Sequence, residues 1–140
     1  MPPSKLLPVA GKLHAALFKL PVVGETLVRG ANRALGHVAF RAPYFGAQKQ
    51  SSIREVMDAW FAFLGKNGIT PRIDKMEGDT CLWSVEACPY GYCCAADRGV
   101  CDAVMDLDRT YTKLLGGEMV ILERIPDGKP SCRYQTRFKG

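Results

Sequence analysis

Six cysteines are the residues of this sequence whose type and spacing best fit a chemical role. They are Cys81, Cys88, Cys93, Cys94, Cys101 and Cys132, and the first five fall within 21 positions. Thiolates are ligands that zinc and iron–sulfur clusters prefer. In a reducing compartment, closely spaced cysteines serve more often as metal ligands or reactive thiols than as disulfides. The spacing therefore predicts a metal site, while the even count also remains compatible with three disulfides.

Not every cysteine is expected to bind the metal. Cys93 and Cys94 are adjacent, and because consecutive side chains diverge, we treat them as alternatives for one ligand position. The expected ligand set is then Cys88, Cys93 or Cys94, Cys101 and Cys132. This spacing is neither that of a zinc ribbon nor that of a ferredoxin. Four thiolates suit an iron–sulfur cluster and zinc equally well. Cys81 alternates with Trp83 along a predicted strand and is expected to be a small buried apolar residue, and Cys94 could be one as well.

The predicted local structure would bring the remaining thiols together. Residues 88–99 contain Pro89 and Gly91 and lie between a strand and a helix, so this irregular loop can direct several side chains to one point. Cys101 is expected in the first turn of the helix, where free backbone amides would stabilise a thiolate. Cys132 follows the last turn, and strand pairing would return it to the loop.

The elements themselves follow from hydrophobic periodicity and turn residues. Ser52 and Glu55 form a capping box that begins a helix, and Asn67-Gly68 ends it. The spacing then predicts strands over 69–76 and 80–87, a helix over 100–115, and strands over 118–125 and 131–138. The sequence thus predicts an α+β fold with N-terminal helices, followed by two antiparallel β-hairpins and one helix between them, packed on one sheet.

Length and composition agree with one ordinary core. The chain has 140 residues, 47% of them hydrophobic and 24% charged. These values argue against a disordered chain, a collagen-like chain and a two-domain enzyme. No convincing export signal and no apolar run of membrane-spanning length is found, which predicts a cytoplasmic protein.

The N-terminal third differs from the rest in charge. Of the 19 basic side chains seven lie in residues 1–52, together with one of the 14 acidic ones, Glu25. Two amphipathic helices, broken near Pro21 and Gly24, fit the apolar spacing. We therefore divide the chain into a basic helical segment, residues 1–50, and a cysteine-containing α+β domain, residues 51–140.

Several surfaces could receive these basic helices. They can pack on the domain that follows, on a second copy of the chain or another protein, or lie on an anionic membrane surface. The segment has neither helix-turn-helix spacing nor interleaved aromatic and basic residues, which disfavours nucleic acid as a partner.

The cysteine domain resembles a known type of small-ligand domain. The resemblance rests on Cys88-Pro89-Tyr90, on Cys101 at a helix start, on Leu114-Leu115-Gly116-Gly117 and Leu122-Glu123-Arg124, and on Asp127-Gly128 leading to Cys132-Arg133-Tyr134. This pattern resembles the cysteine-containing 4-vinyl reductase type of domain, over roughly residues 53–138. It is similar too to the sensor half of iron–sulfur-responsive repressors of cluster assembly operons.

The resemblance implies an α+β module that holds a metal, a cluster such as [4Fe–4S] or a small hydrophobic ligand, and that serves as a sensor or accessory protein. Cys88, Cys101 and Cys132 match the cluster-binding positions, whereas Cys93 falls at a slightly different spacing from the repressors' loop cysteine. The repressors' winged helix is absent, so direct control of transcription is not implied. Related proteins described as amino-thiazoline carboxylate hydrolases also keep an enzymatic interpretation open.

Three functions follow from these patterns. The first is a non-enzymatic metal-binding accessory or redox-sensing module. The second is a ligand carrier whose pocket would be lined by Trp60, Trp83, Tyr90 and Tyr111, although such aromatics are also ordinary core residues. The third is a thiol-dependent hydrolase, which would need a base beside its thiol.

The candidate bases for such a hydrolase are few. His14 and His37 both lie in the N-terminal segment, where we expect them to be exposed. The acidic residues around the start of the second predicted helix, Asp97, Asp102, Asp106 and Asp108, are expected to form a solvated face that the helix dipole favours.

Overall fold

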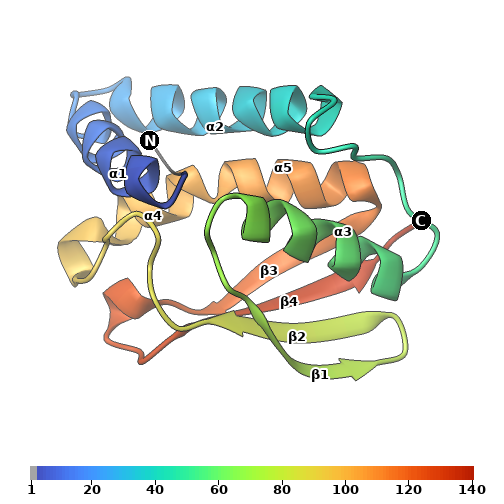
Figure 1. Ribbon diagram of the computed structural model, residues 1–140. Coiled ribbons are helices and arrows are strands. Elements are labelled where there is room, and N and C mark those ends of the chain that lie inside the picture. Colours follow the sequence, from blue (N-terminus) through green and yellow to red (C-terminus); the bar gives the residue numbers. More distant parts are fainter. Residues whose placement is uncertain (1–2) are drawn as a thin grey trace.

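The computed structural model describes residues 3–140, with side chains from residue 5 onward, so the first two residues of the basic segment lie outside the described part. The elements follow in the order α1 (Pro3–Phe18), α2 (Gly24–Arg41), α3 (Ile53–Lys66), β1 (Arg72–Glu77), β2 (Thr80–Val85), α4 (Arg98–Val104), α5 (Asp106–Leu115), β3 (Gly117–Glu123) and β4 (Cys132–Phe138). Short 3-10 turns cover Ala95–Asp97 and Ile125–Asp127. This is the predicted α+β fold with helices preceding the strands (Figure 1).

One sheet carries all four strands. They pair in the order β1-β2-β4-β3, and every pairing is antiparallel. The β1–β2 hairpin closes through Gly78 and Asp79, with Gly78 in a left-handed conformation at φ +59°, as the turn residues predicted. The second hairpin, β3–β4, supplies the two remaining strands.

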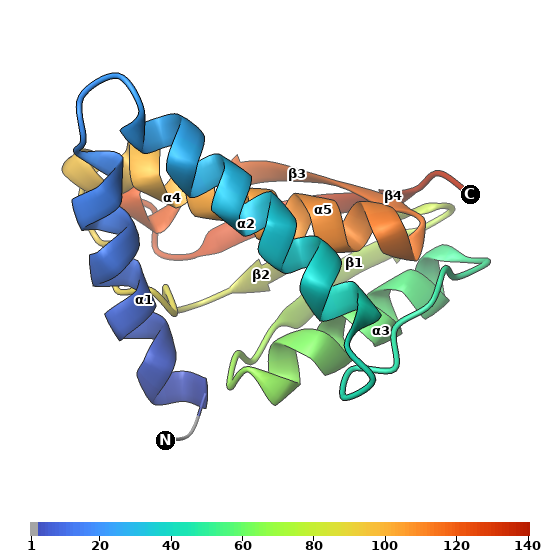
Figure 2. The ribbon, with the colours of Figure 1, turned by 90° about the horizontal axis from the view of Figure 1, so that it is seen from above.

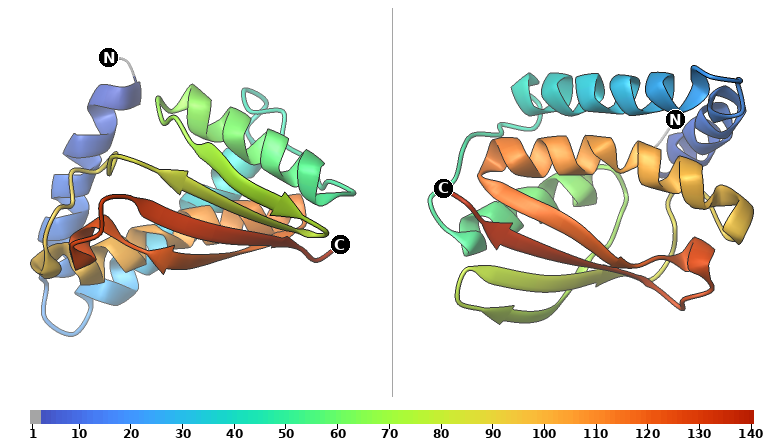
Figure 3. Two further views of the ribbon diagram at one scale, coloured as in Figure 1. Left: turned by 90° about the horizontal axis from the view of Figure 1, so that it is seen from below. Right: turned by 180° about the vertical axis from the view of Figure 1, so that it is seen from behind.

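The helices lie in layers on one side of this sheet. In Figure 1, α3 and α5 lie directly above the strands and α2 lies above α5, while α1 stands at one end. Seen from below, the strands lie in front of the helices, so no described helix covers that face (Figure 3, left). Val120 and Leu122 of β3 are accordingly about half exposed.

Local signals set the ends of α3. The hydroxyl oxygen of Ser52 accepts a hydrogen bond from the Glu55 backbone N–H at 3.2 Å. The Glu55 carboxylate turns back to Ser51 instead of Ser52, accepting from its backbone N–H at 3.0 Å and from its hydroxyl at 2.7 Å. At the other end Gly68 takes a left-handed conformation. The predicted N-terminal cap therefore forms, but the hydrogen bond to the Glu55 carboxylate comes from Ser51 instead of Ser52.

The chain between the hairpins forms two helices, where periodicity predicted one helix over 100–115. Helix α4 ends at Val104 and α5 begins at Asp106, with Met105 between them. Neither glycine nor proline marks this break. The carboxylates on either side of it, Asp102 and Asp106, are both bound by arginines, a tertiary arrangement that periodicity does not record.

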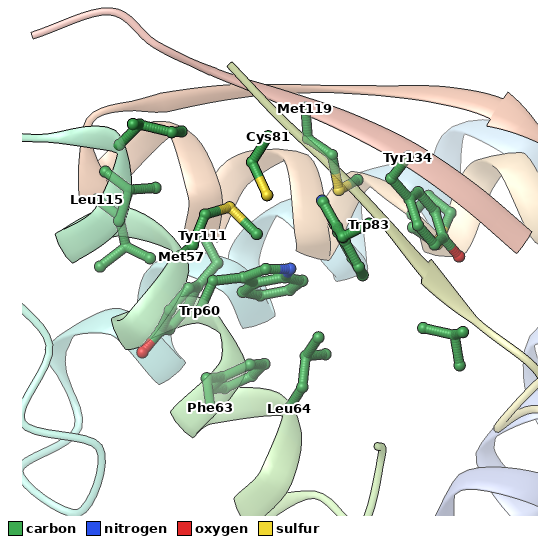
Figure 4. Close-up of a cluster of buried hydrophobic side chains, with 14 of the residues drawn as sticks. Met57, Trp60, Phe63, Leu64, Cys81, Trp83, Tyr111, Leu115, Met119 and Tyr134 are labelled. Carbon is green, nitrogen blue, oxygen red and sulfur yellow. The ribbon is translucent and has the colours of Figure 1, made fainter. Parts of the chain in front are cut away.

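The main core lies between the sheet and helices α3 and α5. Trp60, Trp83 and Tyr111 are fully buried there, with ring centroids 6.2 Å apart for Trp60–Trp83 and 5.7 Å apart for Trp60–Tyr111. Cys81 is also fully buried among them, beside Met57 in Figure 4. A smaller cluster, which includes Val28, Val100 and Val104, joins α2 to α4.

The N-terminal helices pack on the rest of the chain. Arg29 of α2 contacts Asp102 at 2.8 Å and Asp106 at 3.3 Å, and Arg33 contacts Asp106 at 2.9 Å. Figure 2 shows α2 lying across α5, with α1 at the edge of the molecule. No helix among the described residues is both long and apolar enough to cross a membrane.

Candidate metal centre

Three cysteines from different parts of the fold line one cavity. Cys88 lies in the loop after β2, Cys101 on α4, and Cys132 is the first residue of β4. The sheet register explains part of this convergence, because Cys132 pairs with Val85, three residues before Cys88. Helix α4 then brings Cys101 over the same point. Of the expected ligand set, these three cysteines line the same cavity.

The cavity is small and lies where the two hydrophobic clusters meet. Its volume is about 40 Å³, and its lining is mostly apolar. Besides the three thiols, the polar side chains at its wall are Asp108 of α5 and the phenols Tyr90 and Tyr134. A cavity of this size admits an ion or about one water molecule, and it is far below the volume of a drug-sized ligand pocket.

Burial raises the pKa of two of the thiols. The pKa of Cys88 is raised by burial, against an opposing effect of the backbone N–H groups of Tyr92, Tyr90 and Gly91. Burial and the neighbouring Cys88 and Cys132 raise the pKa of Cys101 to about 12. The expected stabilisation of a Cys101 thiolate by the start of its helix is therefore outweighed, and without a metal this thiol stays protonated near neutral pH.

Cys132 receives a hydrogen bond from the backbone. The N–H of Ile125, in the turn after β3, donates to the Cys132 sulfur at 3.4 Å. Arg124, the residue before it, has an exposed side-chain fraction of 17% and lowers the pKa of Cys101 by its charge. An amide donor and a cation beside these sulfurs both favour their anionic, ligand-competent form.

Asp108 lines the cavity, although the sequence predicts it on a solvated acidic face. Burial raises the pKa of its carboxyl to about 7, against a lowering effect of Arg109. Cys101, Val104 and Asp108 are spaced by three and four residues, a spacing typical of one helix face. This signal could have placed Asp108 with Cys101 instead of on a solvated acidic face.

The other acidic residues near α4 also have partners. Asp102 is bound by Arg29, by Arg109 at 2.7 Å and by Arg124. Asp106 has a side chain only 7% exposed and contacts Arg109 at 2.9 Å. Both carboxylates therefore tie α2, α4 and α5 together, in place of the solvated face that we expected.

Cys93 and Cys94 lie outside the cavity, on the surface of the same loop. Their sulfurs lie within 4.8 Å of each other and of an Asp97 carboxylate oxygen. The Asp97 carboxylate accepts from the Cys93 backbone N–H at 3.0 Å and from the Cys94 thiol at 3.6 Å. Among the described residues, Cys93, Cys94 and Asp97 are the group of three potential metal ligands whose ligand atoms already lie within 4.8 Å of one another. Neither cysteine joins Cys88, Cys101 and Cys132.

The predicted aromatic pocket residues take two different places. Trp83 and Tyr90 line the small cavity, whereas Trp60 and Tyr111 are packed in the core. An open groove of about 440 Å³ lies next to the cavity and shares Ile69 and Pro89 with it. Of the two histidines, His37 is exposed, and His14 is half-buried, 6.5 Å from the Tyr90 ring.

Comparison of the chain with protein-family models and with curated proteins found no match. All six cysteines are free thiols. The chemistry of the site therefore has to be argued from its donor atoms: three thiols and one carboxyl around a small cavity, with a separate pair of thiols at the surface.

Proposed function

We propose that this chain is a non-enzymatic metal-binding module in which Cys88, Cys101 and Cys132 hold the metal. The observation that carries the proposal is that three thiols, distant in sequence, line one small cavity. Thiolates are the donors that zinc and iron–sulfur centres use. The resemblance of these three positions to iron–sulfur sensor domains points in the same direction.

The size of the cavity favours a single ion. A volume of about 40 Å³ has room for one metal ion but not for a cubane cluster, unless the loop around Cys88 opens. In a tetrahedral zinc site the sulfurs lie about 2.3 Å from the metal. The three sulfurs do not form a group within 4.8 Å among the described residues, so binding draws them inward, with Asp108 available as the fourth donor.

The residues of the site would supply charge balance and orientation. Metal binding displaces the thiol protons, so affinity rises with pH as Cys88 and Cys101 lose them. The Ile125 N–H orients the Cys132 sulfur, and Arg124 offsets the negative charge of the thiolates. A bound zinc would stabilise the fold, whereas a bound cluster would add redox chemistry.

An accessory or sensing role fits this site better than thiol catalysis does. A nucleophilic cysteine needs a lowered pKa, but those of Cys88 and Cys101 are raised. Neither His14 nor His37 lines the cavity. A reducing compartment such as the cytoplasm would keep all six thiols available for metal.

One observation favours a second candidate function. The open groove of about 440 Å³ beside the cavity, bounded by Ile69, Arg72 and Pro89, is within the size range of small-ligand sites. The second candidate is therefore a small-ligand domain whose ligand occupies this groove.

Single cysteine replacements test the metal proposal. Cys88→Ser, Cys101→Ser and Cys132→Ser should each lower the metal retained after anaerobic purification. The matched control is Cys81→Ala, at a buried cysteine that does not line the cavity. The Cys93→Ser variant tests whether the retained metal depends on the surface pair Cys93 and Cys94 instead of the buried site. Full metal retention in all three serine variants would refute the proposal.

A further inference from the structure

Helix α1 carries an exposed apolar stripe on its outer side. Leu6, Val9 and Leu13 have exposed fractions of 50%, 59% and 60%, and their spacing of three and four residues places them on one helix face. Leu20, just after the end of α1 at Phe18, is also exposed, at 45%. Apolar side chains aligned in this way form a continuous patch, unlike scattered exposed leucines.

The stripe is exposed even though α1 packs on the rest of the protein through its opposite face. The opposite side of the helix packs on the cysteine loop, where the Tyr92 hydroxyl donates to the Gly11 carbonyl oxygen at 3.0 Å and the His14 ring meets Tyr90 edge-on. Gly11 is buried against the Tyr90 backbone. Helix α1 therefore holds one face against the protein and presents the apolar one outward.

The loop after α1 also exposes apolar side chains. Val22 is fully exposed, and Val23 is 49% exposed. Val22 also has a φ of +68°, a left-handed conformation that is strained for a β-branched residue. The fold thus holds an apolar side chain in water at a backbone cost, in the loop that joins α1 to α2; Figure 2 shows this loop at one end of the molecule.

The charged side chains of residues 5–24 are all lysines. Lys5 and Lys12 lie seven residues apart on α1, so they form a row on one side of the helix, and Lys19 follows directly after its end; all three are exposed. The first acidic residue of the chain is Glu25, and its carboxylate is paired with Arg29 at 3.0 Å. An apolar strip edged by lysines matches the boundary between lipid headgroups and acyl chains.

We propose that the α1 stripe and the Val22 loop bind an anionic membrane surface, with the apolar side chains entering the headgroup boundary and the lysines contacting lipid phosphates. A second copy of the chain fits less well. Antiparallel pairing of two stripes brings one lysine row close to the other, and residues 3–24 contain no acid to offset the repulsion.

Vesicle sedimentation with the full chain tests this proposal. Phosphatidylcholine vesicles mixed with phosphatidylglycerol should bind the protein, and pure phosphatidylcholine vesicles should bind it at least about tenfold more weakly. Val9→Asp should weaken binding to the anionic vesicles by about tenfold or more. The matched control is Val120→Asp, which places the same change at a 47% exposed valine on the open face of the sheet and should leave binding unchanged.

A second variant guards against misfolding as the cause. Lys12→Gln combined with Lys19→Gln changes only exposed side chains and should weaken binding to anionic vesicles while leaving the circular dichroism spectrum unchanged. Equal binding to both kinds of vesicle, or unchanged binding of Val9→Asp, would overturn the proposal. The proposal would also be overturned if the wild-type protein bound no vesicles and formed a dimer in solution that Val9→Asp converts to a monomer. The stripe would then bind a second copy of the chain.

Discussion

Gly11 is the position where one added methyl group should separate α1 from the cysteine loop. A Cβ atom built there meets the Tyr90 carbonyl oxygen closer than real Cβ atoms approach, and it lies 3.0 Å from the Tyr90 Cβ. The obstacle is mostly backbone, so no side chain can rotate away. Gly11→Ala should therefore displace either α1 or the loop that contains Cys88.

The size of the effect follows from two opposing contributions. Alanine in a helix interior is favoured over glycine by about 1 kcal/mol, whereas overpacking costs about 1–3 kcal/mol. A backbone obstacle argues for the upper end, so Gly11→Ala should lower the free energy of unfolding by about 2 kcal/mol. Gly30→Ala is the matched control, because Gly30 is exposed within α2 and its Cβ would meet nothing within 4 Å. That variant should be more stable by up to about 1 kcal/mol.

Two assays check this prediction. Urea unfolding gives the difference in stability between the two variants. Titration with a thiol reagent should also show faster modification of Cys88 in Gly11→Ala, with Cys93 and Cys94 reacting equally in both variants because they are already exposed. If Gly11→Ala were as stabilising as Gly30→Ala, the close packing of α1 on the cysteine loop would be refuted.

Three further predictions concern single residues. Burial would raise the pKa of Asp102, but hydrogen bonds from arginines outweigh it and hold the pKa at about 2, below the ordinary 3.8. The carboxylate should thus contribute about 2 kcal/mol to the free energy of unfolding above pH 4, and this contribution should be lost as the pH falls from about 4 to 2. Urea unfolding across this range should show a flatter dependence of stability on pH for Asp102→Asn than for the wild type. Thr136→Val removes the acceptor of the buried Trp83 indole N–H, now at 3.0 Å, and should cost about 1–3 kcal/mol in the same assay. Gly116 ends α5 at φ +109°, so Gly116→Ala should lower the melting temperature, with a loss of about 1–2 kcal/mol. An Asp102→Asn profile as steep as the wild type, or no destabilisation in either of the other two variants, would contradict the corresponding interpretation.

The parts of the fold that the sequence predicts are those decided by neighbouring residues. Ser52 and Gly68 mark the ends of α3, and Gly78 closes the first hairpin, because capping hydrogen bonds and left-handed glycines act over a few positions. The break at Met105 was missed, since the arginines that bind Asp102 and Asp106 come partly from α2, more than 70 residues earlier.

The candidate site was predictable in part for a similar reason. Strand pairing brings Cys132 to the end of β2, as the order of turns and strands indicates. The outward direction of Cys93 and Cys94 depends on the path of an irregular loop, which spacing does not determine. The raised pKa of Cys101 depends on how deeply α4 is buried, and burial of a short helix is a property of the whole fold.

The most direct test of the metal centre is quantitation of iron, zinc and acid-labile sulfide per chain after anaerobic purification, with the Cys101→Ser variant measured alongside. We expect a stoichiometric metal in the wild-type protein, either zinc alone or iron and sulfide in comparable amounts, and its loss in the variant. A wild-type protein free of iron and zinc, with all six of its cysteines reacting as thiols after unfolding, would contradict it.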